Sequence, residues 1–142
     1  MAADRTGARP RETGTGSRRA ARPSKERLAA EKRGRSGESL AALMLRLKGY
    51  RILGRRIRTR AGEIDLVARS PQGVLCFVEV KARDGEAAAA LSVAPRQQQR
   101  IARAAALFVA GRPELARAAM RFDIVAVSPH ALPRHIRDAW RP

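Results

Sequence analysis

The apolar positions of this chain first repeat with the period of a helix. In the segment SGESLAALMLRLKGY, which starts at Ser36, large apolar residues recur at spacings of three and four, at Leu40, Leu43, Met44 and Leu47. Ser36 can cap the start of this helix and Gly49 can end it. The pattern therefore predicts a helix that begins at Ser36 and stops before Gly49.

Strand patterns with a period of two follow. YRILGRRIR (50–58) predicts an outer strand with an irregularity at Gly54. EIDLVAR and VLCFVEVKA are stronger strand patterns, and the turn residues SPQG separate them. We expect these two strands to form an antiparallel hairpin.

A second helix and a further strand complete the pattern. From Pro95 to Gly111, one stripe carries the apolar residues Ile101, Ala104, Ala105 and Phe108. RFDIVAV (121–127) predicts a strand that Pro129 ends, and the pattern of ALPRHIRDAW leaves helix and strand open. The order of elements predicts an α/β fold with a mixed central sheet and flanking helices.

The first 36 residues differ in composition from the rest. They contain eleven basic residues against four acids, with hardly a large apolar side chain before Leu28. Such a segment cannot bury enough apolar surface to fold, so we expect a disordered basic tail at 1–36 and one folded domain at 37–142. The tail is either a solvated extension or a source of loose, salt-sensitive phosphate contacts.

Composition limits the location of the protein. Cys76 is the only cysteine, so neither an internal disulfide nor a cysteine-based zinc site can form within one chain, and a reducing, cytoplasmic location fits best. No apolar run approaches the roughly 20 residues that span a bilayer, so we expect no membrane partner.

The net charge is +17, from 30 Lys and Arg against 13 Asp and Glu. Such a field favours a polyanionic partner, and nucleic acid is the leading candidate. Biased codon usage is the alternative explanation, because only four of the basic residues are lysines.

Charged residues interrupt the apolar hairpin strands. Alternation puts Glu79 and Lys81 on one face of their strand, and Glu63 and Asp65 on one face of theirs. Three acids and one lysine can then converge on a small patch. Because a buried lone carboxylate costs several kcal/mol, these groups should be paired, hydrogen-bonded or bound to a metal. Glu79 and Lys81 can alternatively form an ordinary ion pair on an exposed strand.

Hydrolysis of a phosphodiester would use such a patch. Two carboxylates from neighbouring strands can hold Mg²⁺, or Mn²⁺ in its place, beside a phosphate. The ion would stabilise the developing charge and lower the pKa of a bound water. Lys81 could orient that water or take its proton.

Four segments together resemble a known family: GESLAALMLRLKGYRIL, GEIDLVA, FVEVKAR and RFDIVAV. From about Gly34 to the C-terminus the chain is similar to the YraN family of small bacterial proteins, which is related to archaeal Holliday junction resolvases. The wider group is the PD-(D/E)xK nucleases, which have a restriction-endonuclease-like fold. By resemblance, Asp65, Glu79 and the Val80 carbonyl would ligate Mg²⁺, Lys81 would orient the water, and Glu38 would complete the site. Glu38 can alternatively be a first-turn acid that the helix dipole favours.

The resemblance implies a nucleic-acid-binding protein with a Mg²⁺-dependent endonuclease site, resolvase-like, acting on structured DNA, and a homodimer. The alternatives are a nucleic-acid-binding protein without catalysis and a small basic protein of a ribonucleoprotein particle. The chain departs from the family where GRRIRTR lacks the usual Asn and Trp, and near Gln97 and Gln98, where lysine is common.

Other polar and aromatic residues have ordinary structural explanations. Glu63 is a structural residue or a neighbour of the ligands. We expect Asp123 to pair with an arginine or to lie at a sheet end. His130 and His135 have no partner at metal-ligand spacing, so they should be surface or packing residues. Trp140 should cover an apolar edge.

Overall fold

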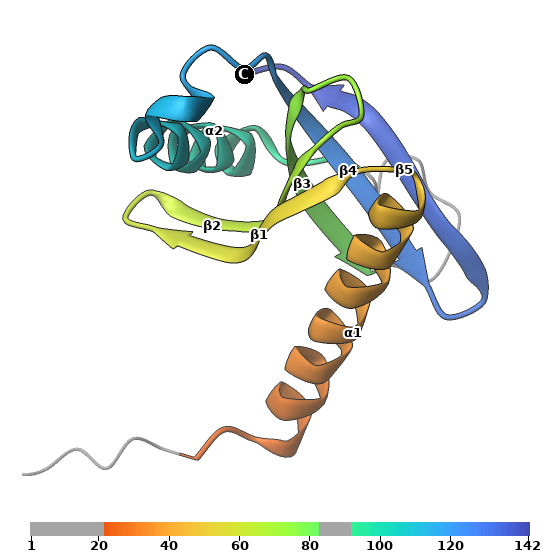
Figure 1. Ribbon diagram of the computed structural model, residues 1–142. Helices are drawn as coiled ribbons and strands as arrows, with labels where there is room; N and C mark the ends of the chain where they lie inside the picture. Colours follow the sequence, from red (N-terminus) through yellow and green to blue (C-terminus); the bar gives the residue numbers. More distant parts are fainter. Residues whose placement is uncertain (1–21, 83–91) are drawn as a thin grey trace, which may run out of the picture.

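The protein is a five-stranded mixed sheet with a helix on each face (Figure 1). The computed structural model describes residues 22–82 and 92–142. Its elements are α1 (Lys25–Leu47), β1 (Arg51–Thr59), β2 (Gly62–Arg69), β3 (Leu75–Ala82), α2 (Pro95–Ala110), the short 3-10 helix η2 (Pro113–Leu115), β4 (Met120–Ser128) and β5 (Ala131–Trp140). The strand order is β1-β2-β3-β4-β5, with β3 and β4 parallel and the other neighbours antiparallel. The predicted mixed central sheet with flanking helices is confirmed.

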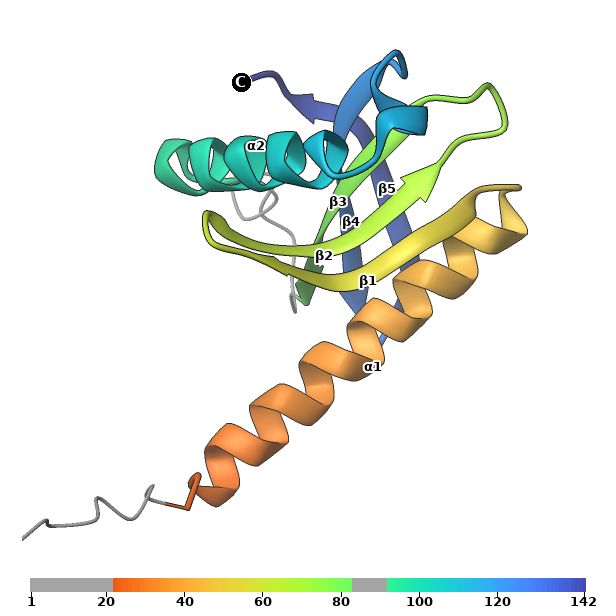
Figure 2. The same cartoon turned by 60° about the vertical axis from the view of Figure 1, so that its left-hand side comes forward.

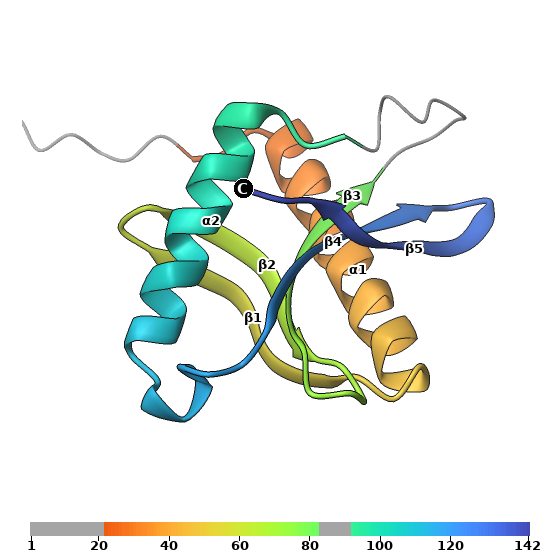
Figure 3. The ribbon, with the colours of Figure 1, turned by 90° about the horizontal axis from the view of Figure 1, so that it is seen from above.

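The sheet separates two apolar cores, because α1 and α2 lie on opposite faces (Figure 3). The predicted stripe of α2 is buried against Phe77 and Phe122 of the sheet. On the other face, Ala42 and Leu45 of α1 pack against Val78. Each helix therefore covers one face of the central strands.

The cap of α1 lies twelve residues earlier than predicted, so the helix start at Ser36 was wrong. Ser24 is the N-cap, and its Oγ accepts a hydrogen bond of 3.3 Å from the Arg27 N–H. Ser36 lies inside the helix, where its Oγ donates to the Lys32 carbonyl at 3.0 Å. Residues 25–36 project from the domain, almost entirely exposed (Figure 1). Their Ala, Leu, Glu, Lys and Arg residues favour helix without packing.

The predicted disordered tail at 1–36 was therefore wrong for residues 25–36, and one helix runs across the expected domain boundary. Residues 1–21 lie outside the described residues.

Two glycines determine how α1 meets the sheet. Gly49 has φ of +84° directly after the helix, a conformation that glycine adopts without strain, and it ends the helix as predicted. Gly37 is buried where α1 crosses the sheet, and a Cβ there would lie 2.9 Å from Cγ2 of Val127. The missing side chain at residue 37 allows this close approach.

Strand β1 is an edge strand with two irregularities. Its pairing with β2 shifts register between Ile52 and Gly54, as the sequence predicted. Arg56 has φ of +48°, a left-handed conformation that non-glycine residues seldom adopt. The β1–β2 hairpin bends strongly as a result (Figure 2).

The C-terminal segment is the second edge strand, β5. It tolerates Pro133 because an edge strand has one side without ladder bonds. Trp140 is buried, with its ring centroid 5.4 Å from that of Phe122, which confirms that it covers an apolar edge. Cys76 is also buried, and burial raises the pKa of its thiol to about 11.

Asp123 is fully buried at the centre of a polar cluster. The guanidinium of Arg121 donates two hydrogen bonds of 2.8 Å to its carboxylate, and the Asp138 N–H donates another at 2.9 Å. The His135 ring lies 2.8 Å away and has no exposed side-chain surface. Burial alone would raise the pKa of Asp123, but the bonds from His135, Arg121 and Asp138 hold it below its usual range. The predicted pairing with an arginine is confirmed, and His135 is a packing residue.

Within residues 22–82 and 92–142, no helix is both long and apolar enough to cross a membrane.

Candidate active site at the opening of the sheet

The sheet opens between β2 and β3, beside Asp65. Their backbone register runs from Arg69–Leu75 to Leu66–Val78 and ends there. Beyond that point the Val80 N–H donates to Asp65 Oδ2 at 2.8 Å, so a side-chain carboxylate replaces a backbone carbonyl as acceptor. Figure 1 shows the end of β2 next to the β1–β2 turn lying away from β3. The opening places a half-buried carboxyl group between two strands of the sheet.

Asp65 and Glu79 meet in this opening, on neighbouring strands. Their carboxyl groups share a hydrogen bond, which lowers the pKa of Asp65 and raises that of Glu79. Burial is the largest influence on both groups and raises both pKa values, that of Glu79 to about 7. Two carboxyls this close share one proton near neutral pH.

Gln97, in the first turn of α2, holds Glu79 in place. Its Nε2 donates to Glu79 Oε1 at 2.8 Å, and this bond favours the ionised carboxylate. Glu79 therefore has one oxygen engaged by α2 while its carboxyl also contacts Asp65.

The side chains of β2 do not alternate regularly between the two faces of the sheet around Asp65. Ile64 belongs to the core under α2, whereas Leu66, two positions along, belongs to the core under α1. In a regular strand these two residues would share a face. The register places Asp65 opposite Arg56, whose left-handed backbone interrupts β1. Glu63, expected beside Asp65, instead forms ion pairs with Arg58 and Arg56.

Glu38 reaches the site from the middle of α1. Its side chain is nine-tenths buried, and its Oε2 lies 3.5 Å from Nε of Arg56. Neither of these two atoms has a hydrogen-bond partner. Burial raises the pKa of Glu38, Arg56 opposes this, and the charges of Asp65 and Glu63 add to the rise. Because α1 starts at Lys25, Glu38 is not in its first turn, and the helix-capping alternative is wrong.

Lys81 lies two residues beyond Glu79 on β3 and is half-buried. Its positive charge lowers the pKa of Glu79. It makes no hydrogen bond or salt bridge of its own with any described residue. No hydrogen bond or salt bridge within residues 22–82 and 92–142 therefore competes with a bound group for this ammonium.

The site offers a divalent cation the neighbouring carboxyl groups of Asp65 and Glu79. In the part of the chain that the structure describes, no three His, Cys, Asp or Glu side chains are grouped closely enough to hold a metal ion. Asp65 and Glu79 form a pair, and the buried Oε2 of Glu38 lacks a hydrogen bond beside Arg56. Mg²⁺ often binds through one or two carboxylates and keeps several waters, so the pair fits this cation.

Sequence reasoning missed two residues of the site. Arg56 gave no signal, because it is one arginine among many in GRRIRTR. Gln97 was noted only as a departure from a family pattern, and its bond to Glu79 depends on how α2 packs.

Comparisons with known proteins agree with the motifs. The family model described as Uncharacterised protein family UPF0102 matches residues 37–127. The chain belongs to this family. A UPF0102 protein of Paramagnetospirillum magneticum is 54% identical over 123 residues, which cover 84% of this chain and 95% of that protein. One from Parvibaculum lavamentivorans is 52% identical and covers 81% and 86% respectively. The family resemblance predicted from the sequence is confirmed.

Among solved structures, SfsA of Pyrococcus furiosus in complex with Ca²⁺ is similar to the chain of this UPF0102 protein. The match has a TM-score of 0.28 at 15% sequence identity. It covers 80% of this chain, which spans only 65% of the SfsA chain.

Proposed function

We propose that this UPF0102 protein is a divalent-metal-dependent phosphodiesterase, an endonuclease of the resolvase-like kind, that acts on structured DNA. The observation that carries the proposal is the contact between the Asp65 and Glu79 carboxyls in the opening of the sheet, beside Lys81. Acidic groups at the centre of a chain of net charge +17 would repel a phosphate unless a cation lay between them.

Asp65 and Glu79 would hold Mg²⁺ or Mn²⁺, with Glu38 and the Val80 carbonyl as further ligands. When bound, the cation would supply charge stabilisation at the phosphoryl oxygen and an acidified water. Glu38 can serve in this way because its Oε2 is buried and unsatisfied, so a cation would replace the weak contact with Arg56.

The other residues would position these groups. The Val80 N–H orients Asp65, and Gln97 orients Glu79, so both carboxyls are held before any ligand arrives. Lys81 would hold the attacking water or contact the phosphate, since no described partner engages its ammonium.

The substrate class follows from charge and from the resemblance. A net charge of +17 favours nucleic acid over small phosphate esters, because many phosphates can be contacted at once. The resemblance to resolvases points to branched DNA and to a homodimer, since two strands must be cut. Size-exclusion chromatography with light scattering tests the dimer.

Cleavage assays test the proposed function directly. Wild type, Glu79→Gln and Lys81→Ala would be incubated with branched and linear DNA in Mg²⁺, Mn²⁺ or EDTA. Glu114→Gln and Lys48→Ala remove the same charges elsewhere and serve as matched controls. We expect metal-dependent cleavage by wild type and both controls, and a loss of at least 100-fold in the two site variants. Cleavage that survives both site substitutions would refute the assignment.

A second candidate is a nucleic-acid-binding protein without catalysis. The observation that favours it is that no three metal-ligating side chains are grouped in residues 22–82 and 92–142. Metal-dependent tightening of DNA binding with no cleavage of any substrate would select this alternative.

A further inference from the structure

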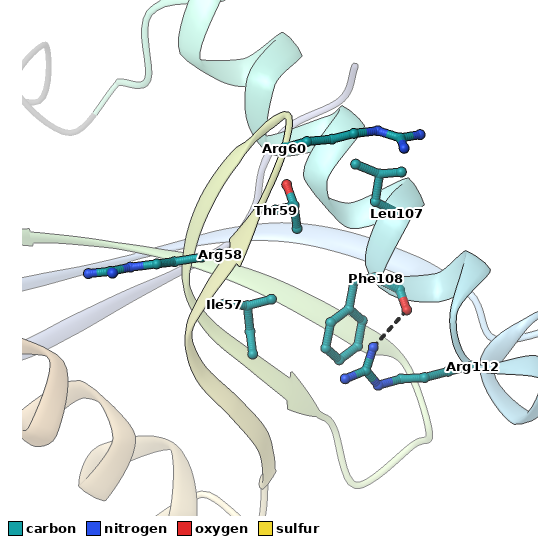
Figure 4. A pocket seen from close by; sticks show the side chains of 7 residues that line it. All are labelled: Ile57, Arg58, Thr59, Arg60, Leu107, Phe108 and Arg112. Atoms are coloured by element: carbon teal, nitrogen blue, oxygen red, sulfur yellow. Dashed lines mark hydrogen bonds between the residues drawn. The ribbon is translucent and has the colours of Figure 1, made fainter.

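A shallow groove lies between the tip of the β1–β2 hairpin and the C-terminal half of α2. Its volume is about 430 Å³, and Ile57, Leu107 and Phe108 form its apolar floor. Arg58, Arg60 and Arg112 also line it. Figure 4 shows Arg60 and Arg112 at opposite ends, with Leu107 and Phe108 between them, while Arg58 points away. The groove therefore presents two cations across an apolar surface.

Arg112 is held rigidly in this groove. Its guanidinium carbon lies 3.7 Å from the centroid of the Phe108 ring, a cation–π contact. Its Nη1 also donates to the Phe108 carbonyl at 3.0 Å, which is the dashed line in Figure 4. A guanidinium fixed in this way loses little conformational entropy when its other N–H groups bind an anion.

The hairpin tip that carries Arg60 is also ordered by its own hydrogen bonds. Thr59 Oγ1 donates to the Gly62 carbonyl at 2.8 Å and accepts from the Ala61 and Gly62 N–H groups at 3.1 and 3.2 Å. Arg60 itself is exposed. No acidic side chain of the described residues forms an ion pair with Arg60 or Arg112, whereas Arg58 is paired with Glu63. Arg60 and Arg112 thus keep their full charge for a ligand.

Helix α2 connects this groove to the candidate active site. Gln97, which bonds to Glu79, and Leu107, which lines the groove, lie ten positions apart on the same helix. At 1.5 Å per residue the separation is about 15 Å. DNA carries one phosphate per 3.4 Å of helix axis on each strand, so a separation of about 15 Å corresponds to about four or five nucleotides.

We propose that Arg60 and Arg112 form a phosphate-binding site for a DNA strand, about four or five nucleotides from the phosphate at Asp65 and Glu79. The proposal rests on the proposed function for the identity of the polymer. The apolar floor contacts the sugar between two phosphates, and the two guanidinium groups bind the phosphates themselves. The site adds affinity and register without choosing a sequence.

The test compares two double variants of equal charge. Arg60→Gln/Arg112→Gln removes the proposed site, and Arg134→Gln/Arg137→Gln removes two exposed arginines from β5, at the other edge of the sheet. Binding of a fluorescent DNA is measured by anisotropy in EDTA at several salt concentrations. We expect the groove variant to bind about 10- to 100-fold more weakly at 0.1 M salt, with the slope of log K against log salt reduced by about 1.8. The control variant in β5 should lose much less DNA affinity.

Binding to branched DNA whose duplex arms differ in length provides a second measurement. Shortening the duplex arm below about four base pairs should weaken binding by wild type and leave the groove variant unaffected. Equal losses in both double variants, or a groove variant that still responds to arm length, would overturn the proposal. Both measurements use binding without metal, so a protein that binds DNA but never cuts it would refute the nuclease assignment while leaving this site intact.

Discussion

Oε2 of Glu38 lies 3.5 Å from Nε of Arg56, and both atoms are buried without a hydrogen bond. The two residues come from α1 and from the left-handed position of β1, so this contact joins the helix to the edge of the sheet. The guanidinium supplies the positive charge that the buried carboxylate needs.

Replacing Arg56 tests whether that charge occupies the place of a cation. Arg56→Gln should lower the free energy of unfolding of the metal-free protein by about 1–2 kcal/mol, because Glu38 loses its partner. The same change should tighten Mg²⁺ binding several-fold by calorimetry, because Glu38 is released. Arg51→Gln removes an exposed charge from the same strand as a control. Mg²⁺ affinity no higher than that of the control would exclude Glu38 as a ligand.

Glu79 should make the metal-free protein less stable as pH rises. Its pKa is raised from 4.5 to about 7, so the folded state holds a proton that the unfolded state releases. The stabilisation is complete below pH 4.5 and disappears as pH rises through 7, and it amounts to at most about 3 kcal/mol. Urea unfolding at a series of pH values should show this decline in wild type and a smaller one in Glu79→Gln. Parallel curves would contradict the shared proton.

Mg²⁺ should reverse this loss of stability, because a cation binds the ionised carboxylates and not the unfolded chain. At pH 8 we expect the unfolding temperature of wild type to rise with Mg²⁺ concentration. Asp65→Asn and Glu79→Gln should show no rise, and Glu114→Gln should behave as wild type. A rise in all four proteins would place the cation elsewhere.

The buried cluster around Asp123 should carry much of the stability of the sheet. Asp123→Asn leaves the Arg121 guanidinium without its charge partner inside the protein, so we expect a loss of about 3–5 kcal/mol in urea unfolding. Asp138→Asn provides the control, since its pair with Arg141 is largely exposed and should contribute far less to stability. Similar losses in the two variants would show that the cluster is not stabilising.

Two glycines of α1 offer a matched test of its packing. Gly37→Ala would bring a Cβ to 2.9 Å from Val127 Cγ2 and should cost about 1–3 kcal/mol. At Gly34 a Cβ meets nothing within 4 Å, so Gly34→Ala should stabilise by up to about 1 kcal/mol through helix propensity. The thermal midpoint of unfolding should therefore fall in Gly37→Ala and rise in Gly34→Ala. A stabilised Gly37→Ala variant would mean that α1 can move away from the sheet.

The parts of the fold that carry buried apolar residues were predictable from the sequence. The stripe of α2 and the hairpin of β2 and β3 follow from apolar periodicity, which tertiary packing preserved. The first half of α1 was missed because it is exposed, and so no apolar pattern marks it. β5 stayed open because Pro133 and the exposed edge obscure the alternation.

The residues of the candidate site were also predictable only in part. The convergence of Asp65 and Glu79 was expected from strand alternation, and in the structure their carboxyls are in contact. Glu38 was placed in a first turn because the helix start was misjudged. The contacts of Arg56 and Gln97 depend on the left-handed residue in β1 and on how α2 packs, and neither leaves a local pattern.

The irregular edge strand β1 has one more consequence. Its outer side is not paired in this sheet, and such an edge invites a strand from a second molecule. The register shift near Gly54, the left-handed Arg56 and the exposed side chains of Arg51, Arg55 and Arg58 all oppose that pairing. The same guanidinium groups that raise the charge of the chain therefore also oppose the pairing of β1 with a strand of another molecule, and we expect a variant stripped of them to aggregate through this edge.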